Sequence, residues 1–181
     1  MRILREHTAA ILIDYQEKLM PVMHDKERLL NQSVKLIKGL KLLNIPMLIT
    51  QQYTKGLGKT VREITECAKT DEYIDKLSFS CYDNTDVKQW FLNKEHIRYV
   101  ILCGIETHIC VQQTAIDLKQ AGYQPVLITD CCSSRKPYDT EIAQKRLAME
   151  GCILTSCEAV LFELMREAGS STFKELSALI K

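Results

Sequence analysis

The stretch that decides the fold is YVILCGIETHIC, at residues 99–110. Its first half, from Tyr99 to Cys103, is an unbroken apolar run, which is typical of a strand buried on both faces of a parallel sheet. Its second half passes through Gly104 and enters a stretch with helical spacing near Thr107. A buried strand that leads directly into a helix is the repeating unit of an α/β domain.

The same alternation of apolar runs and amphipathic stretches continues along the chain. The runs that predict strands lie at residues 9–13, 46–50, 99–103, 125–129 and 152–155. The stretches that predict helices lie at residues 27–44, 83–94, 107–122, 138–151, 156–168 and 171–180. Residues 51–80 are the least regular part and have few periodic apolar positions. The pattern predicts one α/β domain over residues 1–181, with a doubly wound, mainly parallel β-sheet and helices on both faces.

Composition excludes several classes of function. The 181 residues carry 24 basic and 23 acidic side chains, a formal net charge of +1, so we expect no nucleic-acid partner and no anionic membrane surface. No apolar window approaches the ~18 residues that a membrane span requires, and the first apolar run is too short for a secretory signal. These features predict a cytoplasmic protein.

The eight cysteines admit four explanations: disulfides, a metal site, a nucleophile, or packing alone. A cytoplasmic chain that is long enough to bury a core disfavours a disulfide framework. The absence of any Cys-x-x-Cys motif and of any histidine pair four residues apart disfavours a metal site, and no cofactor is predicted. A nucleophile and packing therefore remain.

Cys110 is the candidate nucleophile. We expect it in the first turn of the helix that begins near Thr107, where the helix N-terminus lowers the pKa of a thiol and backbone N–H groups can stabilise an oxyanion. Asp14 ends the first apolar run, and Lys76 lies in the irregular stretch. A thiolate, a lysine that holds it charged and an aspartate that moves a proton form a complete nucleophilic site. The residues alone leave open that Cys110 is a packing residue, Asp14 a solvated or capping acid, and Lys76 a surface lysine.

Three segments in one order resemble the isochorismatase-like cysteine hydrolases, a superfamily that includes nicotinamidases and N-carbamoylsarcosine amidases. The segments are LIDYQ at residues 12–16, DKLSFS at 75–80 and GIETHICV at 104–111. The resemblance extends to TDCCSSR at 129–135 and EAVLFEL at 158–164, so it covers essentially the whole chain. It implies a catalytic triad of Asp14, Lys76 and Cys110. It also implies a cis peptide bond between Ile105 and Glu106, and an oxyanion hole formed by the backbone N–H groups of Glu106 and Cys110.

Three departures from the superfamily narrow the expectation. Metal-dependent nicotinamidases carry an Asp-x-His motif where this chain has Gln51, Gln52 and Tyr53, so neither that metal nor that substrate is supported. Isochorismatase proper cleaves a vinyl ether and lacks the nucleophilic cysteine, so Cys110 argues against isochorismatase activity. Nicotinamidases often have a small residue where this chain has Glu106.

The resulting hypothesis is a metal-independent cysteine hydrolase that cleaves a small-molecule substrate, an amide in the first instance, through a thioester on Cys110. Leu19, Gln52, Phe79 and Thr107 are the predicted walls of the substrate pocket. The resemblance also implies a homo-oligomer, a dimer or larger. Two alternatives remain: a non-catalytic interaction or regulatory protein that keeps the fold, and a redox-active thiol protein.

Overall fold

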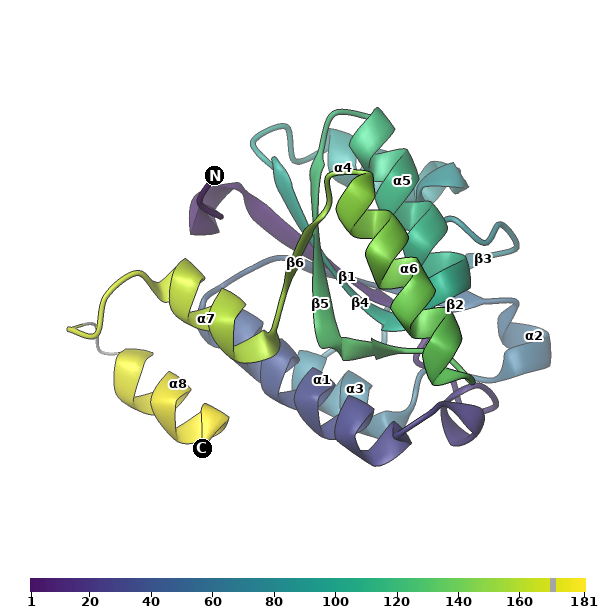
Figure 1. Cartoon of the computed structure of the whole chain (residues 1–181), viewed down its shortest axis with the longest axis horizontal. Coiled ribbons are helices and arrows are strands. Elements are labelled where there is room, and N and C mark those ends of the chain that lie inside the picture. The colour runs from purple at the N-terminus through teal and green to yellow at the C-terminus, as the bar shows by residue number, and fades with distance from the viewer. Residues whose placement is uncertain (170–171) are drawn as a thin grey trace.

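The computed structural model describes residues 1–169 and 172–181 of the chain. Within these residues six strands form one parallel sheet in the order β3-β2-β1-β4-β5-β6 (Figure 1). The strands are β1 (Thr8–Ile13), β2 (Met47–Gln52), β3 (Ile74–Lys76), β4 (Tyr99–Ile105), β5 (Gln124–Ser133) and β6 (Ile153–Thr155).

The helices cover both faces of this sheet. They are α1 (Lys26–Leu42), α2 (Thr54–Leu57), α3 (Arg62–Ala68), α4 (Thr85–Leu92), α5 (Gln112–Gln120), α6 (Pro137–Met149), α7 (Cys157–Met165) and α8 (Thr172–Ile180). Short 3₁₀ turns lie at Arg5–His7, Met20–Val22 and Cys81–Asp83, and a π-helical turn lies at Thr107–Val111.

The strand order explains why the helices divide into two layers. From β1 the chain adds β2 and β3 on one side, then returns and adds β4, β5 and β6 on the other. Because crossovers between parallel strands are right-handed, the helices of the two halves lie on opposite faces. Accordingly α1 and α3 cover one face, and α4, α5 and α6 cover the other (Figure 1). The last helices, α7 and α8, pack against α1. The predicted doubly wound α/β fold is confirmed.

The two central strands form the core. Every residue of β1 and of β4 is buried, which accounts for the unbroken apolar runs at residues 9–13 and 99–103. At the rim, Asn84 begins α4 by accepting hydrogen bonds from the N–H groups of Asp86 and Val87, and Ser156 begins α7 by accepting one from Ala159.

The sequence pattern predicted most elements but missed some. The five predicted strands are present as β1, β2, β4, β5 and β6. The irregular stretch at residues 51–80 contains β3 and the short helices α2 and α3, because three to seven residues are too few to show a period. The predicted helix at residues 171–180 is α8, and residue 171 lies outside the described residues.

None of the helices that the structure describes combines the length and the apolar character needed to cross a membrane.

Candidate active site

The candidate site lies where the strand order reverses, between β1 and β4. In a doubly wound sheet, the crevice outside the carboxyl ends of these strands is the usual place for a ligand. Asp14 directly follows β1, and the π-helical turn that holds Cys110 directly follows β4. Lys76 ends β3 at the same edge of the sheet. The fold therefore brings together three residues that are far apart in the sequence.

Gly104 allows β1 and β4 to approach closely at this point. Its φ is +135°, and a Cβ atom built on it would lie 2.1 Å from the carbonyl oxygen of Ile13. No side chain larger than hydrogen fits between the strands here. Gly104 thus positions the residue after Ile13, which is Asp14, beside the turn after β4.

Asp14 and Lys76 form a fully buried ion pair. Nζ of Lys76 lies 2.7 Å from Oδ2 of Asp14, and both side chains are 0% exposed. The ammonium group also donates to Oε1 of Gln52 at 2.7 Å. It lies 3.3 Å and 3.2 Å from the carbonyl oxygens of Ser78 and Phe79. These acceptors surround a group that has three protons to donate, so Lys76 is held in one place.

The carboxylate keeps Lys76 charged. Burial is the largest single influence and acts to lower the pKa of the lysine, but the Asp14 charge, the Asp14 hydrogen bond, Cys81 and Cys110 together outweigh it, and the pKa is raised above the ordinary lysine value. A permanent positive charge therefore lies inside the site.

Cys110 lies against the same carboxylate. The residue is only 6% exposed, and the Asp14 charge acts directly on its thiol. Burial and the Asp14 charge raise the pKa of the thiol far above its ordinary value, and Lys76 lowers it only in part. The expectation that the helix N-terminus lowers this pKa is therefore wrong, because burial and the adjacent carboxylate dominate. The resting site holds a thiol that faces a base.

Glu106 is fixed at both its backbone and its side chain. The peptide bond between Ile105 and Glu106 is cis. The Glu106 carbonyl accepts the N–H groups of Ile109 at 3.1 Å and Val111 at 3.3 Å, which closes the π-helical turn. Its carboxylate accepts the backbone N–H of Arg135 at 3.0 Å and Nε of Arg135 at 3.1 Å. The loop after β5 is thereby tied to the turn that holds Cys110.

The four predicted pocket residues have different surroundings. Both ends of the Gln52 side-chain amide are hydrogen-bonded within the protein. Its Oε1 accepts from Lys76, and its Nε2 donates to the Leu77 carbonyl at 2.8 Å. Phe79 is 54% exposed, and Leu19 is partly buried against the core. Thr107 is fully buried, and its hydroxyl has no hydrogen-bond partner within the described residues. The observed contact of Gln52 is therefore with Lys76, and its role as a pocket wall stays a prediction.

Three buried side chains around the triad, those of Gln16, Thr50 and Cys81, are absent from the predicted site. Gln16 donates to the carbonyl groups of Gln52 and Gly58 and accepts the N–H of Gln52 at 2.7 Å, so it fixes the end of β2. The Thr50 hydroxyl donates to Oδ1 of Asp14 at 2.8 Å, the carboxylate oxygen that Lys76 does not contact, and Sγ of Cys81 lies 3.5 Å from the same hydroxyl. A polar residue inside an otherwise apolar strand, as at Thr50, is the pattern that reveals such a role.

The metal-ligand motif of the nicotinamidases has no structural counterpart here. Gln51 and Gln52 end β2, and Tyr53 follows them with its side chain half exposed. Across residues 1–169 and 172–181, no three side chains of His, Cys, Asp or Glu are grouped so that they could hold a metal ion.

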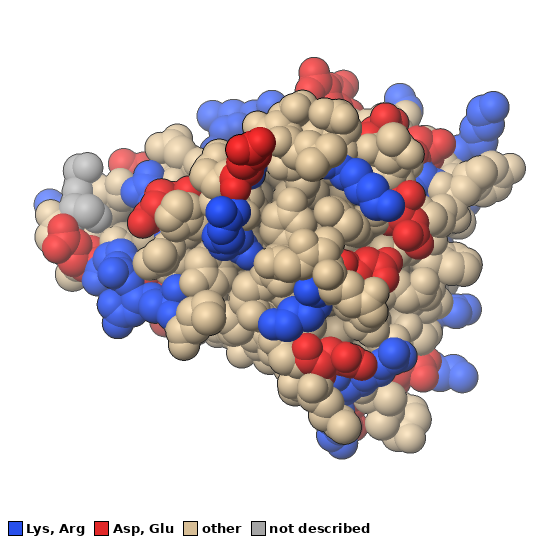
Figure 2. Space-filling view, turned by 90° about the horizontal axis from the view of Figure 1, so that it is seen from above, with Lys and Arg blue, Asp and Glu red and all other residues tan. Residues whose placement is uncertain are grey.

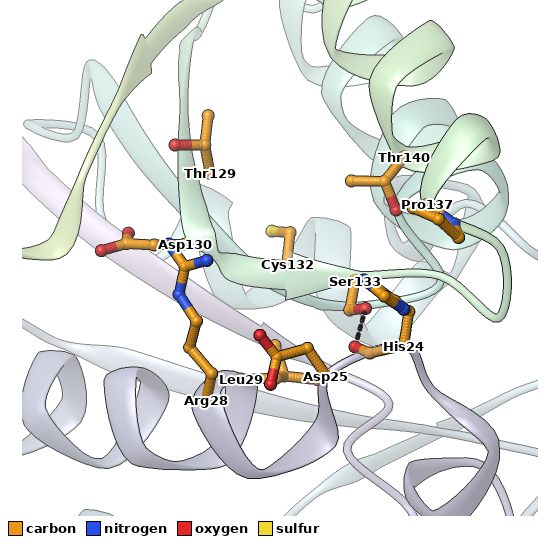
Figure 3. A pocket seen from close by; sticks show the side chains of 10 residues that line it. All are labelled: His24, Asp25, Arg28, Leu29, Thr129, Asp130, Cys132, Ser133, Pro137 and Thr140. Atoms are coloured by element: carbon orange, nitrogen blue, oxygen red, sulfur yellow. Dashed lines mark hydrogen bonds between the residues drawn. The ribbon is translucent and has the colours of Figure 1, made fainter.

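A separate polar cavity of about 180 Å³ lies between the start of α1, strand β5 and the start of α6 (Figure 3). Its lining residues are His24, Asp25, Arg28, Leu29, Thr129, Asp130, Cys132, Ser133, Pro137 and Thr140. Ser133 closes one side by donating to the carbonyl of His24 at 2.8 Å. Burial raises the pKa of the Cys132 thiol well above its ordinary value. No member of the triad lines this cavity.

Known proteins resemble this chain along nearly all of its length. An isochorismatase domain model matches residues 8–159. Isochorismatase domain-containing protein 2A from Mus musculus is 34% identical over 181 residues, covering 99% of this chain and 85% of that protein. The solved structure of MAR1 ribonuclease from Caenorhabditis elegans has a TM-score of 0.92 and 33% identity, covering 99% of this chain and 92% of that chain.

A second solved structure resembles the chain in fold alone. It is the YcaC gene product from Escherichia coli, described as an octameric hydrolase of unknown specificity. Its TM-score is 0.93 at 22% identity, with 99% of this chain and 89% of that chain covered. The family model spans most of the chain, and the Mus musculus relative aligns along nearly all of it. The chain therefore belongs to the isochorismatase domain family.

Proposed function

We propose that the chain is a metal-independent cysteine hydrolase that cleaves a small amide through a thioester on Cys110. The observation that carries this proposal is the fully buried Lys76–Asp14 pair at 2.7 Å with the Cys110 thiol against the same carboxylate. A buried ion pair is a weak source of stability, because desolvation offsets most of the attraction between its charges. Beside a thiol, the same pair supplies a base and a fixed positive charge, which nucleophilic chemistry requires.

The first half of the reaction forms the thioester. Asp14 accepts the proton of the Cys110 thiol, and the sulfur electron pair forms a bond to the carbonyl carbon of the substrate. The carbonyl π electrons move to the oxygen, and the backbone N–H groups of Glu106 and Cys110 stabilise that oxyanion. When the oxyanion collapses, the C–N bond breaks, and Asp14 returns the proton to the leaving amine.

The second half regenerates the enzyme. Asp14 accepts a proton from water, and the resulting hydroxide attacks the thioester carbon. The C–S bond breaks, the acid product leaves, and the proton on Asp14 returns to the Cys110 sulfur. Lys76 stays protonated throughout and offsets the negative charge that is shared between Asp14 and the sulfur.

Burial and charge favour a small substrate over a polymer. The three side chains of the proposed triad are at most 6% exposed, so the reacting bond must enter a confined site. Acidic and basic side chains are interspersed on the face in Figure 2, and the net charge is only +1. A nucleic acid is held by a sustained basic surface, which this face does not offer. The Caenorhabditis elegans relative is named a ribonuclease. The test therefore also measures RNA cleavage.

Three further properties belong to this proposal. All eight cysteines are free thiols, which fits a cytoplasmic location where thiols stay reduced. The octameric assembly stated for the Escherichia coli protein of the same fold supports a homo-oligomer. We take residues 1–181 as one hydrolase domain built on the single sheet.

The test is turnover of an amide and ester panel by the wild type and by Cys110→Ala, with Cys67→Ala as the matched loss of another buried thiol. We expect the Cys110 variant to lose on the order of 10³-fold or more in rate and the Cys67 variant to keep the wild-type rate. Mass spectrometry of wild-type enzyme quenched during turnover should find the acyl group on Cys110.

Two results would overturn the proposal. One is undiminished amide turnover by the Cys110→Ala protein. The other is RNA cleavage by the purified wild type that survives in Cys110→Ala, with no hydrolysis of the small substrates.

A further inference from the structure

Thr50 contacts the proposed general base on the side that the mechanism leaves unused. This residue of β2 is fully buried, and its hydroxyl lies 2.8 Å from Oδ1 of Asp14. Its backbone carbonyl also accepts the N–H of Asp14 at 3.2 Å. On the far side of the hydroxyl, the Sγ atom of Cys81 lies 3.5 Å away. Thr50 therefore links Asp14 to a second buried thiol.

The direction of these hydrogen bonds follows from the chemistry of the groups. An ionised carboxylate only accepts hydrogen bonds, so the Thr50 hydroxyl must donate its one proton to Asp14. The hydroxyl oxygen then has only lone pairs left for Cys81, so the Cys81 thiol must be the donor. Burial, followed by the Asp14 charge, raises the pKa of Cys81 to about 11, which agrees with a protonated donor. The order is thus Cys81 to Thr50 to Asp14.

We propose that Thr50 is a positioning residue that holds the Asp14 carboxylate in the orientation that serves Cys110 and keeps Cys81 out of the reaction. Thr50 occupies Oδ1 and Lys76 occupies Oδ2, so the carboxylate cannot rotate about its Cβ–Cγ bond without losing a charge-assisted hydrogen bond. The carboxylate therefore keeps one orientation while its charge acts on the Cys110 thiol. This inference rests on the proposed function for the role of Asp14 as base, but its contacts do not depend on the substrate.

Thr50 also reduces the effect of the Asp14 charge on both thiols. The titratable groups that face Asp14 are Lys76 from β3, Cys110 from the π-helical turn and Cys81 from the 3₁₀ turn before α4. The Asp14 charge raises the pKa of both cysteines. Removing the hydroxyl that donates to Asp14 leaves more of that charge unbalanced, so Cys110 should become harder to ionise.

The experiment measures alkylation of Cys110 by iodoacetamide at fixed pH, followed by peptide mass spectrometry, so it needs no substrate. Thr50→Val keeps the shape and removes the hydroxyl, and Thr50→Ser keeps the hydroxyl. Thr8→Val is the matched control, because Thr8 is also buried and its hydroxyl donates to the Leu4 carbonyl at the opposite end of β1.

We expect Thr50→Val to alkylate at Cys110 roughly tenfold more slowly than the wild type, which is about the effect of one charge-assisted hydrogen bond. Thr50→Ser and Thr8→Val should alkylate at the wild-type rate. Amide turnover by Thr50→Val should lose kcat with little change in KM, and Thr50→Ser should restore it. Thermal melting of each variant establishes that it is folded.

The inference is overturned if Thr50→Val alkylates as fast as the wild type, or if Thr50→Ser is as slow as Thr50→Val. Its failure can be told apart from failure of the proposed function. Active Cys110→Ala protein would refute the hydrolase mechanism, whereas inactive Cys110→Ala protein combined with unchanged alkylation of Thr50→Val would refute only the role of Thr50.

Discussion

Cys110 lies between two charged groups that act on its thiol in opposite directions. The Asp14 carboxylate raises the pKa of the thiol, and the Lys76 ammonium lowers it. Asp14→Asn removes the negative charge, so we expect alkylation of Cys110 at pH 8 to become at least about tenfold faster. Lys76→Met removes the positive charge, so alkylation should become slower. Both variants should lose amide turnover, because one lacks the base and the other the fixed charge.

The control for this pair is Asp75→Asn. Asp75 neighbours Lys76 in the sequence, but its side chain is exposed, and its carboxylate accepts from the N–H and hydroxyl of Thr54. We expect wild-type alkylation and wild-type turnover from this variant. Slower alkylation in Asp14→Asn would show that the carboxylate helps to ionise the resting thiol, which contradicts the charge arrangement described above.

At the scale of elements, the approach of β1 to β4 decides whether the site can form. Gly104→Ala would place a methyl group about 2.1 Å from the backbone of Ile13, at a φ of +135° that a residue with a side chain rarely adopts. The strands must separate, and Asp14 then moves away from Cys110. We expect several kcal/mol of lost stability, as for other forced overpacking, together with loss of amide turnover. Chemical denaturation and kinetics measure the two effects.

Gly122→Ala separates the effect of the close approach from that of backbone conformation. Gly122 also has a positive φ, +90°, but no atom lies within 4 Å of the Cβ that alanine would add. This variant should lose only about 1–2 kcal/mol and keep its activity. Equal losses of stability and activity in the two variants would show that conformation, and not the contact with Ile13, is what Gly104 provides.

The sequence predicted those elements that are long enough, and buried enough, to show a clear pattern of apolar residues. The central strands are buried throughout, so their apolar runs are unbroken and easily recognised. Strand β3 was missed because it has three residues and one exposed position, Asp75, and no run of that length shows a period. The sequence places Lys76 in an irregular stretch, and the family resemblance, not secondary structure, links it to Asp14 and Cys110.

The sequence predicted which residues form the candidate site but not the direction in which they shift the pKa of the Cys110 thiol. Sequence spacing located Cys110 after a buried strand, and the structure places it in the turn that follows β4. Whether the thiol is ionised depends on burial and on groups from three other segments, and no local pattern records their distances. For the same reason the sequence does not reveal that the Gln52 amide is bound to Lys76 and to the Leu77 carbonyl, and its place as a pocket wall stays a prediction.

At the scale of the whole molecule, exposed apolar side chains on α6 indicate a contact between subunits. Tyr138 and Ile142 are 68% and 44% exposed and lie one turn apart on α6, so they share one face of that helix. This helix follows the end of β5. Exposed apolar side chains that gather on one face are typical of interaction sites.

We therefore predict that the protein sediments as a multiple of its 20.8 kDa chain mass and that α6 contributes to the contact. The double variant Tyr138→Glu and Ile142→Lys should shift sedimentation towards the single-chain mass, because a charge in an apolar contact must lose its hydration. Leu92→Glu is the matched control, since Leu92 is 63% exposed at the end of α4.

A wild type that sediments as a single chain would refute the assembly, and dissociation caused by Leu92→Glu alone would place the contact on α4. If dissociated protein keeps its amide turnover, each chain holds a complete site, as expected from a triad that comes from the residue after β1, the end of β3 and the turn after β4 of one chain.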